Sequence, residues 1–428
     1  LAPCIVGYWV TDHFHQIDPL VLVWIGLTAA IVSAACNRFI VWSLAFTVAS
    51  ICAGGSYFLQ FSASRKPDEQ WLAMPIREID LSFEVIRMFE SKDSGGKISG
   101  IGEIQDAPFI RRDLISKRIY FQLHHQEAHP FVKGMIFRAR GLLKPRVKSS
   151  KKGFESFLDH AGATYSFTRG SICETVKHPS RFSLLCMGIS KRMESTLRLG
   201  GDGRETLSNV SIAMMLGEKS ALQDERKERY VSAGVMHLFA ISGLHVGVIA
   251  AFIAFLLRLL PVSRFLQAFL GLTCLFVYVQ VTGGSPSAMR AFIMVAFWWG
   301  ALLSGRPGAS LPAVAFAAFV TLLLDPLQLW DLGFQLSYSV VTAIILYGSP
   351  LATRLQATWE PWPYIPLEDR SLFQRWSTVV WKWFASAFSV SFAATVASSP
   401  LVLQHFEVFT PGAVLLNVFL VFLAGMVI

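Results

Sequence analysis

Two histidines and a serine lie in a segment that is otherwise apolar enough to cross a bilayer. The run HLFAISGLHVGV, residues 237–248, contains His237, Ser242 and His245, together with Gly243. Imidazole and hydroxyl groups lose their water in hydrocarbon, so they persist there where they pair with a neighbouring helix or line a wet cavity. Ser242 and His245 are three residues apart and share one face of a helix. The run therefore predicts a functional site inside a membrane.

A cation and further polar groups follow in two later apolar segments. Arg290 comes just after the small-residue break GGSPS, residues 283–287, where we expect a helix to begin. A cation beside the backbone N–H groups of a helix N-terminus attracts anions, and a pore for a polyanion needs such groups. Asp331 begins a second polar cluster and is a candidate partner for Arg290 or a histidine. We expect eight residues to line a channel, namely His237, Ser242, Gly243, His245, Arg290, Asp331, Gln335 and Ser337.

Each of these polar residues has a structural alternative, because polar side chains also hold membrane helices in one arrangement. The sequence offers little support for a metal or catalytic centre. HHQEAH, residues 124–129, spaces histidines as some zinc sites do, but its glutamate has the wrong offset for the metalloprotease helix and Pro130 follows. GGDG, residues 200–203, is too short for a phosphate-binding loop. We expect no metal, no cofactor and no catalytic residue.

The chain has the composition of a membrane protein. Of its 428 residues, 53% are hydrophobic and only 16% are charged, and the mean hydropathy is +0.48, which exceeds what the core of a soluble protein needs. A helix that crosses a bilayer needs roughly 17 to 25 residues. Candidate spans near this length lie at residues 20–36, 39–61, 238–260, 265–282, 289–304, 311–324, 332–348, 379–400 and from 414 onward. Because the chain starts at Leu1 and stops inside an apolar run at Ile428, we expect a fragment whose first and last spans are cut.

Residues 64–190 have a different pattern. Four stretches alternate or nearly alternate apolar and polar residues between turn residues, at 81–89, 97–108, 114–123 and 132–145. This alternation is typical of short antiparallel strands. We expect a small all-β barrel of the oligonucleotide-binding (OB) type, with a β-sandwich as the alternative.

The predicted fold class is thus a polytopic α-helical membrane protein with an inserted OB-like barrel outside the membrane. Its parts are N-terminal transmembrane helices over 1–63, the β domain over 64–190, an amphipathic helical segment over 191–235 and a channel domain over 236–428. Within the third part, we expect a helix from about Glu205 to Ala233 that lies along the membrane surface or braces the pore mouth.

Positive charge is concentrated in the β domain. Between Arg65 and Arg181, 21 lysines and arginines stand against 14 aspartates and glutamates, a net +7 of the chain's +9. Cations that track phosphates and aromatic rings that stack on bases are typical of single-stranded nucleic acid binding. The alternatives are a solvated face or attraction to anionic lipid headgroups. The candidate DNA-binding residues are Lys133, Arg138, Arg140, Lys144, Arg146 and Lys148, with Phe131, Phe137 and Phe154 interleaved or adjacent.

The connections between the spans differ in charge. Connections that carry arginine alternate along the chain with connections that carry acidic residues. The first kind holds Arg38, then Arg258 and Arg264, then Arg306, and then Arg354, Arg370 and Arg375. The second kind holds Asp12, Asp18, Asp325, Asp331 and Glu407. Short loops rich in lysine and arginine stay in the cytoplasm, whereas long domains cross regardless of charge, so we expect the β domain outside the cytoplasmic membrane. Cys173 and Cys186 fall in that domain, where a disulfide is permitted; two buried free thiols are the alternative.

Five segments in this order resemble the ComEC competence family. They are GFESFLDHAGATYSF (153–167), GEKSALQDERKERYVSAGVMHLFAISGLHVGVIAAF (217–252), GGSPSAMRAFIM (283–294), DPLQLWDLGFQLSYSVV (325–341) and SSPLVLQHFEVFTPGAVLLNVF (398–419). The resemblance covers most of the chain. It implies an inner-membrane channel that passes one DNA strand into the cytoplasm in natural transformation, with the external β domain contacting DNA.

The resemblance also implies partners, namely single-stranded DNA, membrane lipid, a DNA receptor, and a cytoplasmic motor or single-strand-binding protein. Many members carry a C-terminal metallo-β-lactamase-like domain, but no His-x-His-x-Asp-His sequence occurs in these 428 residues, so we expect a channel rather than an enzyme. The alternative function is a secondary transporter or exporter of a smaller anionic solute or envelope precursor, which would share the interrupted spans and intramembrane polar residues.

Overall fold

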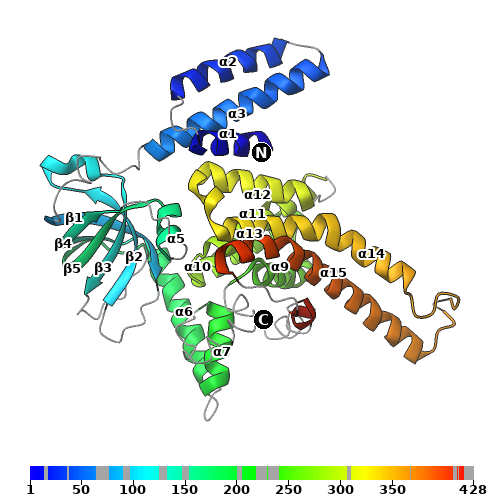
Figure 1. The fold of residues 1–428 in the computed structure, drawn as a ribbon. Coiled ribbons are helices and arrows are strands. Elements are labelled where there is room, and N and C mark those ends of the chain that lie inside the picture. The colour runs from blue at the N-terminus through cyan, green and yellow to red at the C-terminus, as the bar shows by residue number, and fades with distance from the viewer. Residues whose placement is uncertain are drawn as a thin grey trace. The chain divides into compact units, whose positions relative to one another are not determined.

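A computed structural model describes most of the chain and divides it into two units. The described residues are 1–13, 18–35, 38–63, 77–89, 97–124, 133–146, 154–199, 205–217, 229, 241–305, 310–366, 368–407, 412 and 414–418. The first unit combines Leu1–Ser183 with Phe319–Asp331, and the second combines Leu184–Ala318 with Leu332–Ile428. Figure 1 shows the helices and strands, coloured along the chain.

Five strands of the first unit form a closed barrel. The strands are β1 (Arg77–Phe89), β2 (Lys97–Asp106), β3 (Arg118–His124), β4 (Ile136–Pro145) and β5 (Ala163–Lys177). Their order around the barrel is β1-β2-β3-β5-β4, and every pair is antiparallel except β3 with β5. The prediction of a small barrel is confirmed over the β-sandwich. The four predicted strands are present, whereas β5 was missed.

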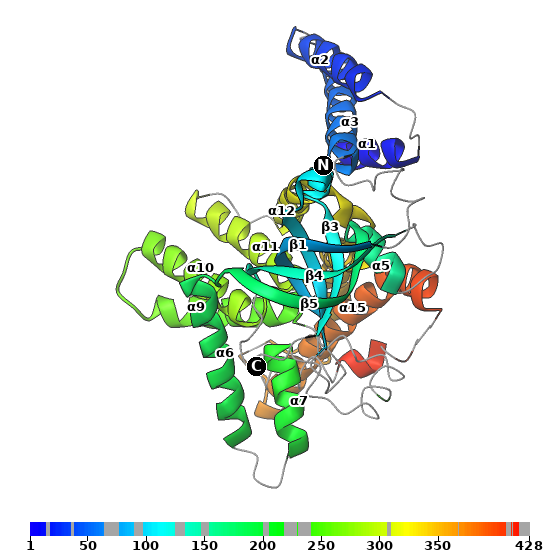
Figure 2. The same ribbon diagram turned by 90° about the vertical axis from the view of Figure 1, so that its left-hand side faces the viewer.

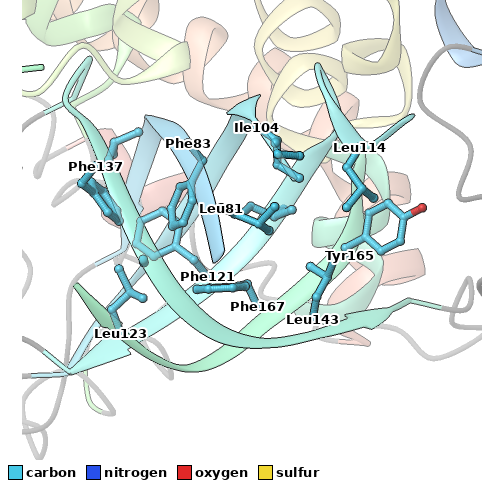
Figure 3. Packing of buried hydrophobic residues seen from close by; sticks show 14 residues of the cluster. Leu81, Phe83, Ile104, Leu114, Phe121, Leu123, Phe137, Leu143, Tyr165 and Phe167 are labelled. Carbon is cyan, nitrogen blue, oxygen red and sulfur yellow. The ribbon is translucent and has the colours of Figure 1, made fainter. Parts of the chain in front are cut away.

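The barrel is closed around a core of aromatic rings. The ring of Phe83 lies 4.5 Å from that of Phe137, 5.2 Å from that of Phe121 and 5.7 Å from that of Phe167, measured between centroids, and all four side chains are buried (Figure 3). Edge-to-face contacts of this kind add to the free energy gained by burying the rings. Gly141 leaves space for them, because a Cβ there would lie 2.8 Å from the Phe167 ring.

Short helices connect the strands of the barrel. The 3-10 helix η1 (Phe109–Leu114) joins β2 to β3, and α5 (Phe154–His160) precedes β5. Leu158 of α5 is fully buried and packs with Ile101 of β2 and Ala163 of β5. The helix α5 is therefore part of the barrel's packing.

Three apolar helices precede the barrel: α1 (Ala2–His13), α2 (Pro19–Ala35) and α3 (Phe39–Ala63). The helices α1 and α2 both pack against α3. Close approach of α1 to α3 depends on Gly7, where a Cβ would collide with the backbone of Ile51.

The remaining elements are helical. They are α6 (Arg181–Leu199), α7 (Glu205–Leu216), α9 (Gly243–Arg258), α10 (Arg264–Val281), α11 (Pro286–Leu303), α12 (Ser310–Leu324), η4 (Pro326–Trp330), α13 (Leu332–Ala343), η5 (Ile344–Gly348), α14 (Ser349–Thr358) and α15 (Leu372–Phe406). Among the described residues, five helices are long and apolar enough to cross a membrane, namely Phe39–Ser62, Arg264–Val281, Pro286–Leu303, Leu332–Thr358 and Leu372–Phe406. Shorter apolar helices cover Pro19–Ala34, Gly243–Arg258 and Ser310–Leu324.

The helical segment after the barrel differs from its prediction. The helix α6 begins at Arg181, inside the stretch assigned to the β domain, and the Ser180 hydroxyl caps it by accepting from the backbone N–H of Ser183 at 3.1 Å. The helix α7 ends at Leu216 rather than continuing toward Ala233, because Gly217 adopts a left-handed φ of 75° that stops the helix.

Prolines shape the last two long helices. Pro350 has no N–H and its ring crowds the carbonyl four residues earlier, and the chain widens there into the π-helical turn η5 between α13 and α14. The helix α15 is 35 residues long with Pro400 inside it, and it extends well beyond the predicted span of 379–400 at both ends.

Candidate channel-lining residues and nucleic-acid interface

Ser242 and His245 form a polar pair at the beginning of α9. Ser242 is the N-cap residue, with φ −103° and ψ 170°. His245 is fully buried, and its Nδ1 lies 2.8 Å from the Ser242 hydroxyl and accepts from the Ser242 backbone N–H at 3.3 Å. Because a backbone N–H can only donate, Nδ1 carries no proton, so the ring is the Nε2–H tautomer and the hydroxyl also donates to Nδ1.

This arrangement gives His245 a structural task. Its side chain takes the position that a glutamate or glutamine has in a capping box, three residues after the N-cap. Within the described part of the chain, its buried Nε2 has no hydrogen-bond partner. The prediction that Ser242 and His245 share a helical face is confirmed, and the pair holds the start of α9.

Arg290 lies in the first turns of α11 and is 4% exposed. Its Nη2 donates to the carbonyl of Gly333 at 2.8 Å, in the first turn of α13. The preceding turn depends on Gly283 and Gly284, whose φ values of 86° and 60° lie in the left-handed region, and the Ser285 hydroxyl then caps α11. The sequence prediction of a helix start beside Arg290 is confirmed.

Three helix N-termini meet at Arg290. Gly243, the first residue of α9, lies against α11, since a Cβ there would be 3.7 Å from that of Ala291. Arg290 itself reaches the first turn of α13 at Gly333. Each N-terminus carries unsatisfied N–H groups and about half a positive charge. A buried guanidinium among three such ends therefore adds positive charge to this part of the second unit.

The second polar cluster is less compact than the sequence suggests. Asp331 ends η4 and is half-buried, as are Gln335 and Ser337 on α13. Gln335 and Ser337 are two residues apart, so they point to different sides of the helix. Asp331 belongs to the first unit and Arg290 to the second, so their pairing stays a prediction. His237 lies outside the described residues.

Alternate residues of β4 form a basic row on the barrel's outer surface. Phe137, Ala139 and Leu143 point into the core and are buried, whereas Arg138, Arg140 and Lys144 are exposed. Lys133 is exposed in the turn before β4, and Lys148 lies outside the described residues. Figure 2 shows β4 between β1 and β5.

Acidic side chains engage two of the candidate DNA-binding cations, Arg140 of the row and Arg146 just after β4. Arg140 makes a bidentate ion pair with Asp80 of β1, at 2.6 and 2.8 Å, and the hydrogen bond from Arg140 lowers the pKa of Asp80. Arg146 contacts Glu155 at 2.6 Å and Asp159 at 3.3 Å, both on α5, and its side chain is only 9% exposed. Arg146 therefore fastens α5 to the barrel.

The remaining candidate cations are Lys133, Arg138 and Lys144, which make no ion pair within the described part of the chain. The expected role of Phe137 in stacking is wrong, because its ring is buried in the core. Phe154 is half exposed and packs edge-on against Phe89 and Tyr120. Phe131 lies outside the described residues. DNA binding by the row stays a prediction.

The candidate disulfide cysteines, Cys173 and Cys186, are not bridged in this structure. Cys173 is exposed on β5, and Cys186 is buried on α6, where burial raises the pKa of its thiol. They belong to different units, and their pairing stays a prediction. Across the described residues, no three His, Cys, Asp or Glu side chains gather as metal ligands, and HHQEAH lies almost entirely outside those residues.

Sequence reasoning missed the contact between Arg118 and Asp325. Arg118, on β3, donates from Nη1 to Oδ2 of Asp325 at 2.9 Å across 207 residues, and both side chains are mostly buried. Both residues belong to the first unit. No sequence signal joins two residues this far apart, although each is a charged residue at the edge of an apolar run.

Comparison with known proteins gives one family match. The family described as "Competence protein" matches residues 214–428, which contain α9 to α15. ComE operon protein 3 of Bacillus subtilis is 31% identical over 209 residues, covering 49% of this chain and 24% of that protein. Competence protein ComA of Neisseria gonorrhoeae is 32% identical over 162 residues, covering 34% and 23%. Recombination protein 2 of Haemophilus influenzae is 25% identical over 213 residues, covering 47% and 25%.

The matched regions thus span no more than a quarter of the length of these three relatives. No solved structure matches the chain.

Proposed function

Because the chain belongs to the competence protein family, with a role in DNA uptake for transformation, we propose that it forms a channel that passes single-stranded DNA into the cytoplasm. Its apolar helices and its family make it a multi-pass membrane protein. The proposed membrane is the bacterial cytoplasmic (inner) membrane.

The observation that carries this proposal is the meeting of three helix N-termini at Arg290, within the family-matched region. A strand of DNA carries one negative charge per nucleotide, and positive potential beside its path lowers the free energy of a phosphate that leaves water there. The positive charge comes largely from backbone dipoles and from a guanidinium already bonded to Gly333. Such a site attracts successive phosphates without holding any one of them in a tight ion pair.

The barrel is proposed to lie outside the membrane and to contact DNA first. Its five-stranded closure supports an OB-type barrel, a fold that binds oligonucleotides. The free cations on the β4 side, Lys133, Arg138 and Lys144, are spaced along one surface where phosphates can bind. External placement follows from the arginines between α9 and α10, at Arg258 and Arg264, which favour the cytoplasmic side for that connection.

The proposal is tested by measuring DNA uptake in cells whose chromosomal copy is deleted and then complemented. DNA bound outside the cell and DNA protected inside it are scored separately. Deletion should leave external binding intact and abolish the protected fraction, and complementation should restore it. Unchanged internalisation in the deletion strain would contradict the channel and favour transport of a smaller anionic solute or envelope precursor. Proposed partners are a DNA receptor and a cytoplasmic motor or single-strand-binding protein.

A further inference from the structure

The outer surface of β3 reaches a turn between two apolar helices. Arg118 donates from Nη1 both to the Asp325 carboxylate, at 2.9 Å, and to the carbonyl of Ala161 at the end of α5, at 3.0 Å. The side chains of Arg118 and Asp325 are only 15% and 17% exposed. Asp325 also caps η4, accepting from the backbone N–H of Leu327 through its other oxygen at 3.3 Å. One carboxylate therefore both starts the turn and binds the barrel.

The same turn is held from the N-terminal helices. The Tyr57 hydroxyl on α3 donates to the carbonyl of Leu323 at 2.6 Å, at the end of α12. The next residue on α3, Phe58, is buried, and its ring lies 4.9 Å from that of Trp330 in η4. The turn is thus fixed by α3 through a hydrogen bond and an aromatic contact, and by the barrel through an ion pair.

Part of the barrel's β2–β3 surface is already occupied. Leu158 of α5 is buried against Ile101 of β2, with Tyr120 of β3 and Phe157 packed around them. The helix α5 also contacts η4 directly. In OB-type barrels this surface is the usual place for an oligonucleotide. Here α5 and the bound turn cover the part of it around Ile101, Tyr120 and Arg118, whereas Gln105 and Gln122 stay exposed, so less of this surface is left for a nucleic acid strand.

We propose that the β2–β3 side of the barrel is a docking surface for the turn between α12 and α13, and that Arg118 is the residue that positions the barrel there through Asp325. The β4 row, two strands away from β3, is left for DNA. The part of this inference that concerns DNA on the β4 row rests on the proposed function. The docking of the barrel on the turn does not depend on DNA.

Docking also restricts how the chain crosses the membrane. Asp325 must lie on the same side of the membrane as Arg118, so an even number of crossings separates the barrel from the turn. Among the described residues between them, four apolar helices follow in the sequence, α9 to α12. One crossing by each satisfies the requirement, although α9 and α12 are short. The ion pair thus places the barrel and the turn on one side of the membrane, as the orientation derived from the arginines also requires, by a route independent of loop charge.

Cross-linking in membranes tests the docking directly. Arg118→Cys and Asp325→Cys are introduced together into the full-length protein, after serine replacement of Cys4, Cys36, Cys52, Cys173, Cys186 and Cys274. A specific protease site inserted after Gly203 separates the two positions. A short bismaleimide cross-linker should join the two cysteines, so that the two cleaved halves of the protein still run as one band on a denaturing gel. For the control pair, Asp80→Cys with Arg140→Cys, opposite each other on β1 and β4, the protease site is inserted after Gly95 instead, so that it separates these two positions; this pair should cross-link and shows that the barrel is folded. Lys144→Cys with Asp325→Cys should not.

Two cross-linking results overturn the docking. One is failure of the 118–325 pair while the 80–140 pair reacts, and the other is equal reaction of the 144–325 pair. Because no DNA is added, either result is independent of whether the protein conducts DNA.

Charge reversal tests whether the docking positions the barrel for uptake. Arg118→Asp and Asp325→Arg should each lose internalised DNA while DNA bound outside the cell is unchanged, and the double variant should regain internalisation because the pair is re-formed with its signs exchanged. Exchanging the exposed pair on α6, Glu194→Arg with Arg198→Glu, is the matched control and should have no effect. Single variants that internalise DNA normally, or a double variant no better than either single one, would refute the positioning role.

Discussion

The guanidinium of Arg290 donates to the backbone carbonyl of Gly333, joining the first turns of α11 and α13 at 2.8 Å. A carbonyl oxygen has two lone pairs, so Gly333 can accept this bond in addition to one within its helix. The side chain is 4% exposed, which places its charge inside the helix packing rather than on an open wall. Arg290 therefore both holds two helices together and supplies positive potential, and variants must separate these roles.

Replacing Arg290 with alanine should abolish DNA internalisation while external DNA binding persists. The variant loses the charge and leaves Gly333 with one donor fewer, at a cost of about 1–3 kcal/mol. Arg290→Lys keeps the charge but not the planar fork, so it should retain part of the uptake. The measurement is protected DNA per cell, normalised to protein in the membrane. A loss of protein in both variants would favour the purely structural role.

His245→Ala should weaken the start of α9, because Ser242 loses the partner of both its backbone N–H and its hydroxyl. Losing a cap typically costs about 0.5–2 kcal/mol. His245→Gln can restore the capping-box bond and should recover thermal stability in detergent. Recovery of stability without recovery of uptake would assign the imidazole a role in conduction. Equal recovery of both would make it a cap alone.

Arg138→Glu with Lys144→Glu should weaken binding of single-stranded DNA and flatten its salt dependence. The plot of log K against log salt has a negative slope, and each phosphate that the protein no longer neutralises reduces the magnitude of this slope by about 0.7 for a single strand. Arg146 is unsuitable for this test, because its bonds to Glu155 and Asp159 fasten α5. Affinity is measured by fluorescence anisotropy over a salt series. An unchanged slope would place the DNA-binding surface elsewhere.

Asp80→Asn should strengthen DNA binding, since it releases Arg140 from its bidentate partner and removes a negative charge beside the row. The slope of the same salt series should steepen by about 0.7 if Arg140 then meets a phosphate. Weaker binding in this variant would mean that Arg140 contributes only when Asp80 holds it in place.

Because of the ion pair between Asp80 and Arg140, we expect the free energy of unfolding of the barrel to fall in acid. The pKa of Asp80 is lowered in the folded state by its hydrogen bond with Arg140, so the pair stabilises the fold above the unfolded pKa of about 3.9 and this contribution disappears as the pH falls through the lowered value. Denaturant unfolding of wild type and Asp80→Asn across that range is the measurement. The two curves should converge at low pH, and parallel curves would contradict the prediction.

The sequence predicted the apolar helices because high hydropathy marks segments that leave water, although little of these helices is buried inside the protein, and it predicted four strands because alternation marks a single buried face. It missed β5, where Gly170 and three irregularities of register against β4 interrupt the alternation. It also missed that Phe137 points inward, since Ile136 beside it is apolar too and the alternation of β4 becomes clear only from Arg138 onward. Pairs such as Arg118 with Asp325 could not be read at all, because their meeting depends on how the whole first unit folds.

The length of α15 has a mechanical consequence. At 1.5 Å per residue its 35 residues make a rod of about 50 Å, whereas the hydrocarbon layer is about 30 Å thick. Even a tilt of about 40°, the upper end for membrane helices, leaves several ångströms of rod projecting into the headgroups or beyond. Trp376, Trp381, Lys382 and Trp383 lie in its first third, where amphipathic rings and a long cationic side chain suit the water–lipid boundary. A displacement of the projecting N-terminal end would be passed along the helix into the bilayer interior, as far as the turn around Pro400, with the boundary residues as its pivot.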